Sequence, residues 1–299
     1  MSDSIPGTPT LKSGTQTPID EGKPGITGLP SIIQLQDIPE QQGNHNLPVT
    51  QSITSRTWSH MQEDVRPSSF VEFELILLTF CTGIQDAISF PDYHCFASNQ
   101  TGNTVFLLLA VAIPWLDGNS FYVSNIGAAL GFFLLGSWVT GQVGYIVGPR
   151  MRLWLVCCNL VQTILVFTAA SLQYKYGARP NGPLAVIDIA LLAFASGSQV
   201  VQSRSMQMTE ISTAMATAAW VDLVIDQGLF KIKNRPRTRR VLFLLALASG
   251  SLLGAGIYRA AGSAVAVFVS AGGKFVVTVM YLFNGADKPR DTADADSSC

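Results

Sequence analysis

Charged residues are scarce in this chain of 299 residues, since Asp, Glu, Lys and Arg make up only 13% of it. That is about half of the roughly 25% found in an average soluble domain. Hydrophobic residues make up 48%, and two stretches, 121–148 and 153–174, contain no charged residue at all. Because about 20 apolar residues suffice to cross a bilayer as a helix, these stretches predict transmembrane helices.

Motifs for catalysis, metal binding and phosphate binding are also missing. The net charge is -1, which gives no reason to expect nucleic acid as a partner. The five cysteines show no metal-ligand spacing, and there is no nucleophile elbow, no phosphate-binding glycine loop followed by Lys and no His-Glu-x-x-His pair. We therefore expect no metal, no cofactor and no enzymatic activity.

The N-terminal residues 1–69 lack sustained hydrophobic periodicity and are rich in Ser, Thr, Pro, Gly, Gln and Asn. Such a segment cannot bury enough apolar surface to offset the entropy of ordering, so it predicts a disordered tail. It has no apolar core like that of a signal peptide, and the first hydrophobic helix is therefore expected to direct insertion. A short polar tail, 285–299, ends the chain.

The remaining region, 70–284, predicts an all-α, polytopic membrane bundle. Eight apolar segments can be distinguished: 70–90, 96–115, 121–147, 153–173, 184–204, 207–226, 240–259 and 262–283. Two of them, 96–115 and 207–226, are short and begin with polar residues. Each is either a full span or a re-entrant segment buried in protein, so we expect six to eight spans.

A weak internal repeat divides this domain into halves at about 70–173 and 184–283. Gly83-Ile84-Gln85 precedes a polar run ending in 101–104, and Gly197-Ser198-Gln199 precedes a similar run at 209–213. A glycine-rich helix and an apolar helix follow in each half. Four spans per half would give parallel repeats, and three would give inverted repeats, an arrangement typical of transporters.

The basic cluster between Lys231 and Arg240 indicates the orientation, because short loops rich in Lys and Arg stay on the cytoplasmic side. Both termini are then also expected in the cytoplasm. With six spans, Arg150 and Arg152 lie on this side too, and with eight spans they lie outside. The plasma membrane is the default location, and other endomembranes are an alternative.

The polar residues between the first two apolar segments predict a site within the membrane, where polar groups are costly. Asp86 is central, since a carboxylate in a helix at the bilayer centre costs roughly 2.5–3.5 kcal/mol unless it is paired, protonated or hydrated. The candidate substrate- or ion-binding residues are Gln85, Asp86, Asn99, Gln100, Thr101, Gly102, Asn103, Gln199 and Arg204. Alternatively, Asp86 is a structural partner of Arg204, and the other side chains link helices by hydrogen bonds.

The sequence resembles the YoaK-type family of uncharacterised bacterial and fungal membrane proteins (domain of unknown function 1275), as a fungal-like member with a long N-terminal tail. The resemblance rests on Gly83, Asp86 and the run Thr101-Gly102-Asn103, and covers roughly residues 72–284. Family members carry Gly-x-Gln-Asn and a second Thr-Gly in the second half, where this chain has Val200 and Ser212-Thr213-Ala214. The resemblance implies an integral membrane protein and no particular activity.

We therefore expect a transporter or permease of an unidentified small solute, with the lipid bilayer as its surroundings. The alternative is a membrane scaffold or assembly partner, which binds other helices through glycine-rich faces and recruits factors through its tail. The same glycine-rich helices would serve a homo-oligomer.

Overall fold

The computed structural model describes residues 53–208, 210–211, 213–214, 216–231 and 233–287. Within these ranges the secondary structure is helical, with isolated β-bridges and no β-strand. The α-helices are α1 (Ile53–Gln62), α2 (Ser69–Tyr93), α3 (Gln100–Ala112), α4 (Val123–Val147), α5 (Arg152–Tyr176), α6 (Pro183–Ser205), α7 (Ala216–Val224), α8 (Arg235–Ala261) and α9 (Ser263–Met280). Two 3₁₀ turns, η1 (Pro114–Leu116) and η2 (Tyr281–Phe283), follow α3 and α9.

Six of these helices are long and apolar enough to cross a membrane: α2, α4, α5, α6, α8, and α9 together with η2. Large apolar side chains on their outer faces are exposed, including Trp138 at 63% and Leu252 at 75%. Water would make so much exposed apolar surface unfavourable, whereas lipid chains cover it without penalty. The chain is a multi-pass membrane protein of the all-α class predicted from its sequence.

The two short apolar segments do not form continuous spans. Helix α3 has 13 residues and α7 has 9, so at a rise of about 1.5 Å per residue neither reaches the roughly 30 Å of a hydrocarbon core. The segment 207–226 is also interrupted, because Gln207 and Thr213 have positive φ angles of 55° and 54°. Six of the eight apolar segments therefore form spanning helices in the described part of the chain, three in each half.

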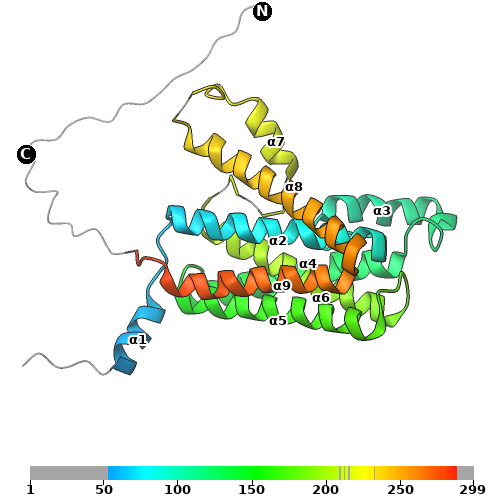
Figure 1. Ribbon diagram of the computed structural model, residues 1–299, viewed down its shortest axis with the longest axis horizontal. Coiled ribbons are helices and arrows are strands. Elements are labelled where there is room, and N and C mark those ends of the chain that lie inside the picture. Colours follow the sequence, from blue (N-terminus) through cyan, green and yellow to red (C-terminus); the bar gives the residue numbers. More distant parts are fainter. Residues whose placement is uncertain (1–52, 209, 212, 215, 232, 288–299) are drawn as a thin grey trace, which may run out of the picture. The chain divides into compact units, whose positions relative to one another are not determined.

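The two halves pack against each other with the symmetry of a repeat. Helix α2 of the first half packs along α8 of the second, and α6 of the second half packs in the same way along α4 of the first. The last helices of the halves, α5 and α9, pack side by side (Figure 1). Because three spans are an odd number, successive halves cross the membrane in opposite directions, which makes the repeats inverted.

Glycines allow close approach where α2 crosses α8. A Cβ atom added at Gly250 would lie 2.1 Å from the carbonyl oxygen of Phe80, and one at Gly83 would lie 2.4 Å from that of Leu247. Both distances are far below van der Waals contact, so only glycine fits at either position. The contacts are reciprocal, because Phe80 is three residues before Gly83 and Leu247 is three residues before Gly250.

The crossing of α4 and α6 repeats this arrangement. A Cβ atom added at Gly197 would lie 2.1 Å from the carbonyl oxygen of Phe133, and one at Gly136 would lie 2.3 Å from that of Phe194. The same number of residues separates Gly83 from Gly197 as separates Gly136 from Gly250. The internal repeat seen in the sequence is thus a repeat of helix packing, and these glycines serve contacts inside the chain.

One end of the bundle joins three distant parts of the chain. The guanidinium of Arg152 is fully buried and donates to the carbonyl oxygen of Asn284 (2.5 Å) and to Glu63 (3.1 Å). Val65 forms a β-bridge with Ala286. Residues 53–66, which the sequence analysis placed in the disordered tail, thus include α1 and a strap that holds this end. Residues 1–52 and 288–299 of the predicted tails lie outside the described residues.

Candidate functional site

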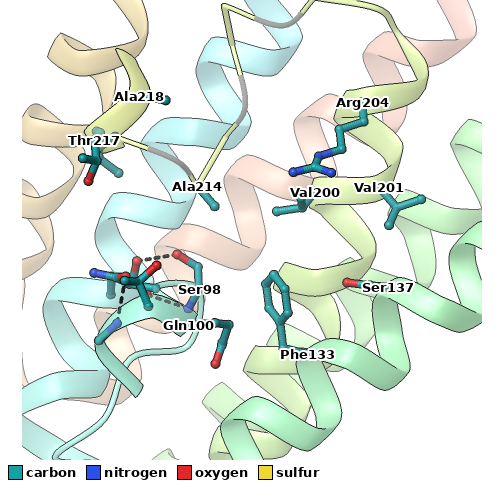
Figure 2. Close-up of a pocket in the computed structure, with 16 residues that line it drawn as sticks. Ser98, Gln100, Phe133, Ser137, Val200, Val201, Arg204, Ala214, Thr217 and Ala218 are labelled. Carbon is teal, nitrogen blue, oxygen red and sulfur yellow. Dashed lines mark hydrogen bonds between the residues drawn. The ribbon is translucent and has the colours of Figure 1, made fainter. Parts of the chain in front are cut away.

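A cavity of about 550 Å³ lies between the two halves, beside the starts of both short helices. Its lining comes from the α2–α3 connection, from α4, from the end of α6, from the start of α7 and from α8. Figure 2 shows Ser98 and Gln100 from the first half on one side, with Val200, Val201 and Arg204 from the second half opposite them. The interface between repeats is where transporters built from repeats bind their substrates.

Asp86 reaches this cavity from α2, and its carboxylate is held by the loop before α3. The Ser98 backbone N–H donates to Oδ1 (2.9 Å), and the Ser98 hydroxyl donates to Oδ2 (2.5 Å). Two hydrogen bonds to one carboxylate offset part of the cost of placing it among apolar helices. The structure therefore pairs Asp86 with Ser98 rather than with Arg204 in the contacts that it describes.

Asn103 shapes the loop that carries Ser98. This side chain is fully buried: its Oδ1 accepts from the Phe96 backbone N–H (2.9 Å), and its Nδ2 donates to the Phe96 carbonyl (2.7 Å) and to Gln100 Oε1 (2.9 Å). Ser89 adds a hydrogen bond from the Ala97 N–H to its hydroxyl (3.2 Å). These contacts satisfy backbone groups that no helix satisfies, which is necessary inside a membrane. Asn103 thus positions the site without lining the cavity.

The other predicted residues of the first half fall into two groups. Asn99, Gln100, Thr101 and Gly102 line the cavity together with Asp86. Asn99 is the N-cap of α3 and accepts from the Gly102 N–H (3.4 Å). Gln85 points elsewhere: it is buried and donates to Ser270 of α9 (2.8 Å).

In the second half, Arg204 lines the cavity and Gln199 does not. Gln199 belongs to a separate buried cluster around Lys274, which donates to Gln199 Oε1 and to Gln162 Oε1 (3.2 Å). Lys274 is fully buried, and no ion pair with a carboxylate is found for it in the described part of the chain. This cluster joins α5, α6 and α9 beside the cavity rather than within it.

The sequence analysis did not single out several residues of the cavity wall. Phe133 and Ser137 contribute from α4, Leu247 from α8, and Thr217 from the start of α7. The repeat could have identified one of them, because Phe133 and Leu247 are separated by the same number of residues as Gly83 and Gly197. Composition could not have identified Phe133 or Leu247, because aromatic and aliphatic side chains are usual in a membrane helix.

The basic cluster at 231–240 is partly helical and partly neutralised. Arg235, Arg237, Arg239 and Arg240 form the first turns of α8. Arg239 pairs with Glu72 of α2 (2.5 Å) and with Glu210 (3.4 Å), so Glu210 is engaged at this end of the bundle instead of at the cavity. Asp226 accepts from the Gly228 N–H (2.7 Å), and this hydrogen bond, with Asn234 and Arg240 nearby, lowers the pKa of its carboxyl.

Cys95 lies in the loop between α2 and α3, which also carries Ser98. It is fully buried, and burial raises the pKa of its thiol to about 12, with the nearby Asp86 charge acting in the same direction. A thiol in this state is a poor nucleophile. Cys95 therefore serves packing, as a small buried apolar side chain does.

Comparison with known families identifies the group to which the chain belongs. A family model described as "Protein of unknown function (DUF1275)" matches residues 75–280. The chain is a member of the DUF1275 family. The match covers all six long helices at least in part and includes the whole cavity lining, so the geometry described above lies within the DUF1275 region.

No curated protein and no solved structure matches this chain. The DUF1275 description assigns no activity. Any function must therefore be argued from the geometry of this site.

Proposed function

We propose that this DUF1275 protein is a transporter or permease for a small solute, which binds in the cavity between the inverted halves. The cavity itself carries the proposal: it lies where the two repeats meet and holds an Asp, an Arg and several polar side chains among apolar helices. Polar groups that face a cavity within a membrane are typical of a substrate pathway.

The symmetric helix crossings support a moving pathway. At each crossing a helix of one half packs against a helix of the other half. Gly83 of α2 meets α8 at Gly250, and Gly136 of α4 meets α6 at Gly197. Inverted repeats can exchange conformations, so that the cavity opens first to one side and then to the other. A scaffold would need neither the cavity nor its charged walls.

We place the basic end of the bundle in the cytoplasm, with both termini. This end carries Arg150, Arg152 and the 231–240 cluster, whereas the other end carries only Lys175, Arg179 and Arg259. The excess of Lys and Arg therefore agrees with the rule that short cytoplasmic loops are basic. The plasma membrane remains our default location.

Cysteine accessibility tests the pathway. On a cysteine-free background, Thr101→Cys and Val201→Cys place thiols on opposite walls of the cavity. We expect a membrane-impermeant thiol reagent to modify both, at rates that change with the side of addition. Two controls should stay unmodified. Leu252→Cys lies on the outer face of α8, where 75% of the Leu252 side chain is exposed and lipid is expected to cover it, and Leu78→Cys is fully buried.

The scaffold alternative predicts a different result. If the reagent reaches neither cavity cysteine from either side, while cysteines in the loops react, the cavity is sealed and the transport proposal is wrong.

A further inference from the structure

The two walls of the cavity carry opposite charges, and each charge comes from a different half. Asp86 of α2 stands on the first-half wall, next to Ser98. Arg204, from the last turn of α6, stands on the second-half wall with its guanidinium near Val200 (Figure 2). Both side chains remain accessible from the cavity: Asp86 is partly buried and Arg204 is exposed.

The repeat shows that the charges on the two walls are not related by symmetry. By the spacing that relates the halves, Val200 occupies the position of Asp86, and Arg204 occupies the position of Phe90. The acid therefore has no acidic counterpart on the second wall, and the base has no basic counterpart on the first. A solute in the cavity meets a negative wall on one side and a positive wall on the other.

The rest of the lining is nearly neutral and leaves room for a solute of moderate size. Phe133 and Leu247 contribute apolar surface, Thr101, Ser137 and Thr217 contribute hydroxyl groups, and Asn99 and Gln100 contribute amides. The cavity volume of about 550 Å³ lies within the range of small-molecule sites. Apolar surface beside two opposite charges fits a solute with two charged groups and a carbon side chain.

We propose that the solute is a small zwitterion of the amino-acid type, with its ammonium group toward Asp86 and Ser98 and its carboxylate toward Arg204. The inference rests on the proposed function and specifies its substrate class. The Asp86 carboxylate accepts from an ammonium, and the Arg204 guanidinium donates to a carboxylate in its planar, two-pronged geometry. The Phe133 and Leu247 surfaces receive the side chain.

Solutes of other charge fit less well. An organic acid without an ammonium has no group that donates to the Asp86 carboxylate, and an amine without a carboxylate has no group that accepts from the Arg204 guanidinium. Each therefore forms one charge-assisted hydrogen bond fewer than a zwitterion does. A neutral sugar would hydrogen-bond to the amide and hydroxyl groups of the lining but would use neither of its two charges.

Binding to the purified full-length protein in nanodiscs tests the class. We would screen the protein amino acids by thermal shift and calorimetry, and then compare each binder with its amide, which lacks the carboxylate, and with its des-amino acid, which lacks the ammonium. We expect both analogues to bind at least roughly tenfold more weakly, since one hydrogen-bonded charge pair is lost in each.

Two variants test which charged group of the solute each wall binds. In Asp86→Asn, the amino acid should fall to the affinity of its des-amino acid, and in Arg204→Gln it should fall to that of its amide. Asp222→Asn and Arg259→Gln remove the same charges away from the cavity and should leave binding unchanged. Equal binding of the amino acid, amide and des-amino acid overturns the proposal, and so does a screen in which no amino acid binds.

Uptake into proteoliposomes separates this inference from the proposed function. Amino acids that bind but do not cross the membrane would contradict transport and leave the solute class standing. Uptake of a neutral or singly charged solute, without binding of any amino acid, would support transport and contradict the zwitterion class.

Discussion

At the scale of single residues, glycines decide how closely the helices of the two halves approach. Gly250 sits against the Phe80 carbonyl, whereas a Cβ atom at Gly256 on the same helix would have no neighbour within 4 Å. Two glycines in one apolar helix therefore have different roles, which their sequence context does not distinguish.

The substitution Gly250→Ala should destabilise the protein by about 1–3 kcal/mol, because the added methyl group forces α2 and α8 apart. Gly256→Ala is the matched control and should be neutral or slightly stabilising, since alanine favours a helix by up to about 1 kcal/mol over glycine. Thermal unfolding in detergent measures both. Equal melting temperatures for the two variants would contradict the close crossing.

Cys95 should resist modification in the folded protein. Its pKa of about 12 leaves almost no thiolate at neutral pH, and its side chain has no exposed surface. We expect maleimide labelling, followed by mass spectrometry, to detect Cys95 only after denaturation. Rapid labelling of the native protein at pH 7 would show that the loop after α2 opens.

Lys274 should stabilise its cluster through hydrogen bonds. Lys274→Met keeps the approximate volume but leaves Gln199 Oε1 and Gln162 Oε1 without this donor, at roughly 1–3 kcal/mol for each buried oxygen. The melting temperature should fall. Adding Gln199→Leu removes one of the unsatisfied oxygens and should recover part of the loss, and a double variant no more stable than Lys274→Met would contradict this account.

At the scale of elements, the short helix α3 depends on the loop before it. Asn103→Ala removes hydrogen bonds to both backbone groups of Phe96, and leaving these groups unsatisfied should cost about 2 kcal/mol or more. Because the same loop holds Ser98 against Asp86, affinity for the solute should fall as well. Asn119→Ala is the control: its side chain is exposed and bonds only the Trp115 carbonyl (2.7 Å) among the described contacts.

The ends and topology of the two short helices, α3 and α7, were the part of the fold that was hardest to predict. Hydropathy gave the six long helices nearly to their ends, but it gave α3 and α7 as apolar segments of undecided topology. Their lengths depend on where the chain turns, at His94 (φ 57°) before α3 and at Gln207 and Thr213 before α7. Non-glycine residues seldom adopt positive φ angles, so neither composition nor hydropathy indicates these turns.

At the scale of the whole molecule, the inverted topology has a direct consequence for accessibility. Single cysteines at Gly118 and Arg179 lie in connections at one end of the bundle, and cysteines at Arg150 and Lys231 lie at the other. With both termini in the cytoplasm, an impermeant reagent added to intact cells should label the first pair only. Permeabilised cells provide the control, and labelling of both pairs from outside would contradict six spans.

The homo-oligomer stays a prediction. The glycines at the two crossings already contact other helices of the same chain. By contrast, a Cβ atom added at Gly127, Gly131 or Gly141 of α4 would have no neighbouring atom within 4 Å. This face of α4 is where a second copy would pack closely.

The sequence by itself determined that this is an integral membrane protein, because long uncharged apolar runs have few other stable environments. It also located the polar run from Asp86 to Gly102, since polar residues between apolar segments stand out in composition. The tertiary structure alone decided which of the candidate polar residues face a cavity: Arg204 does, whereas Gln85, Asn103 and Gln199 are used in packing. The physical reason is that a buried polar side chain needs a partner in either case, and only the packing of the two halves determines whether that partner is another side chain or an open cavity.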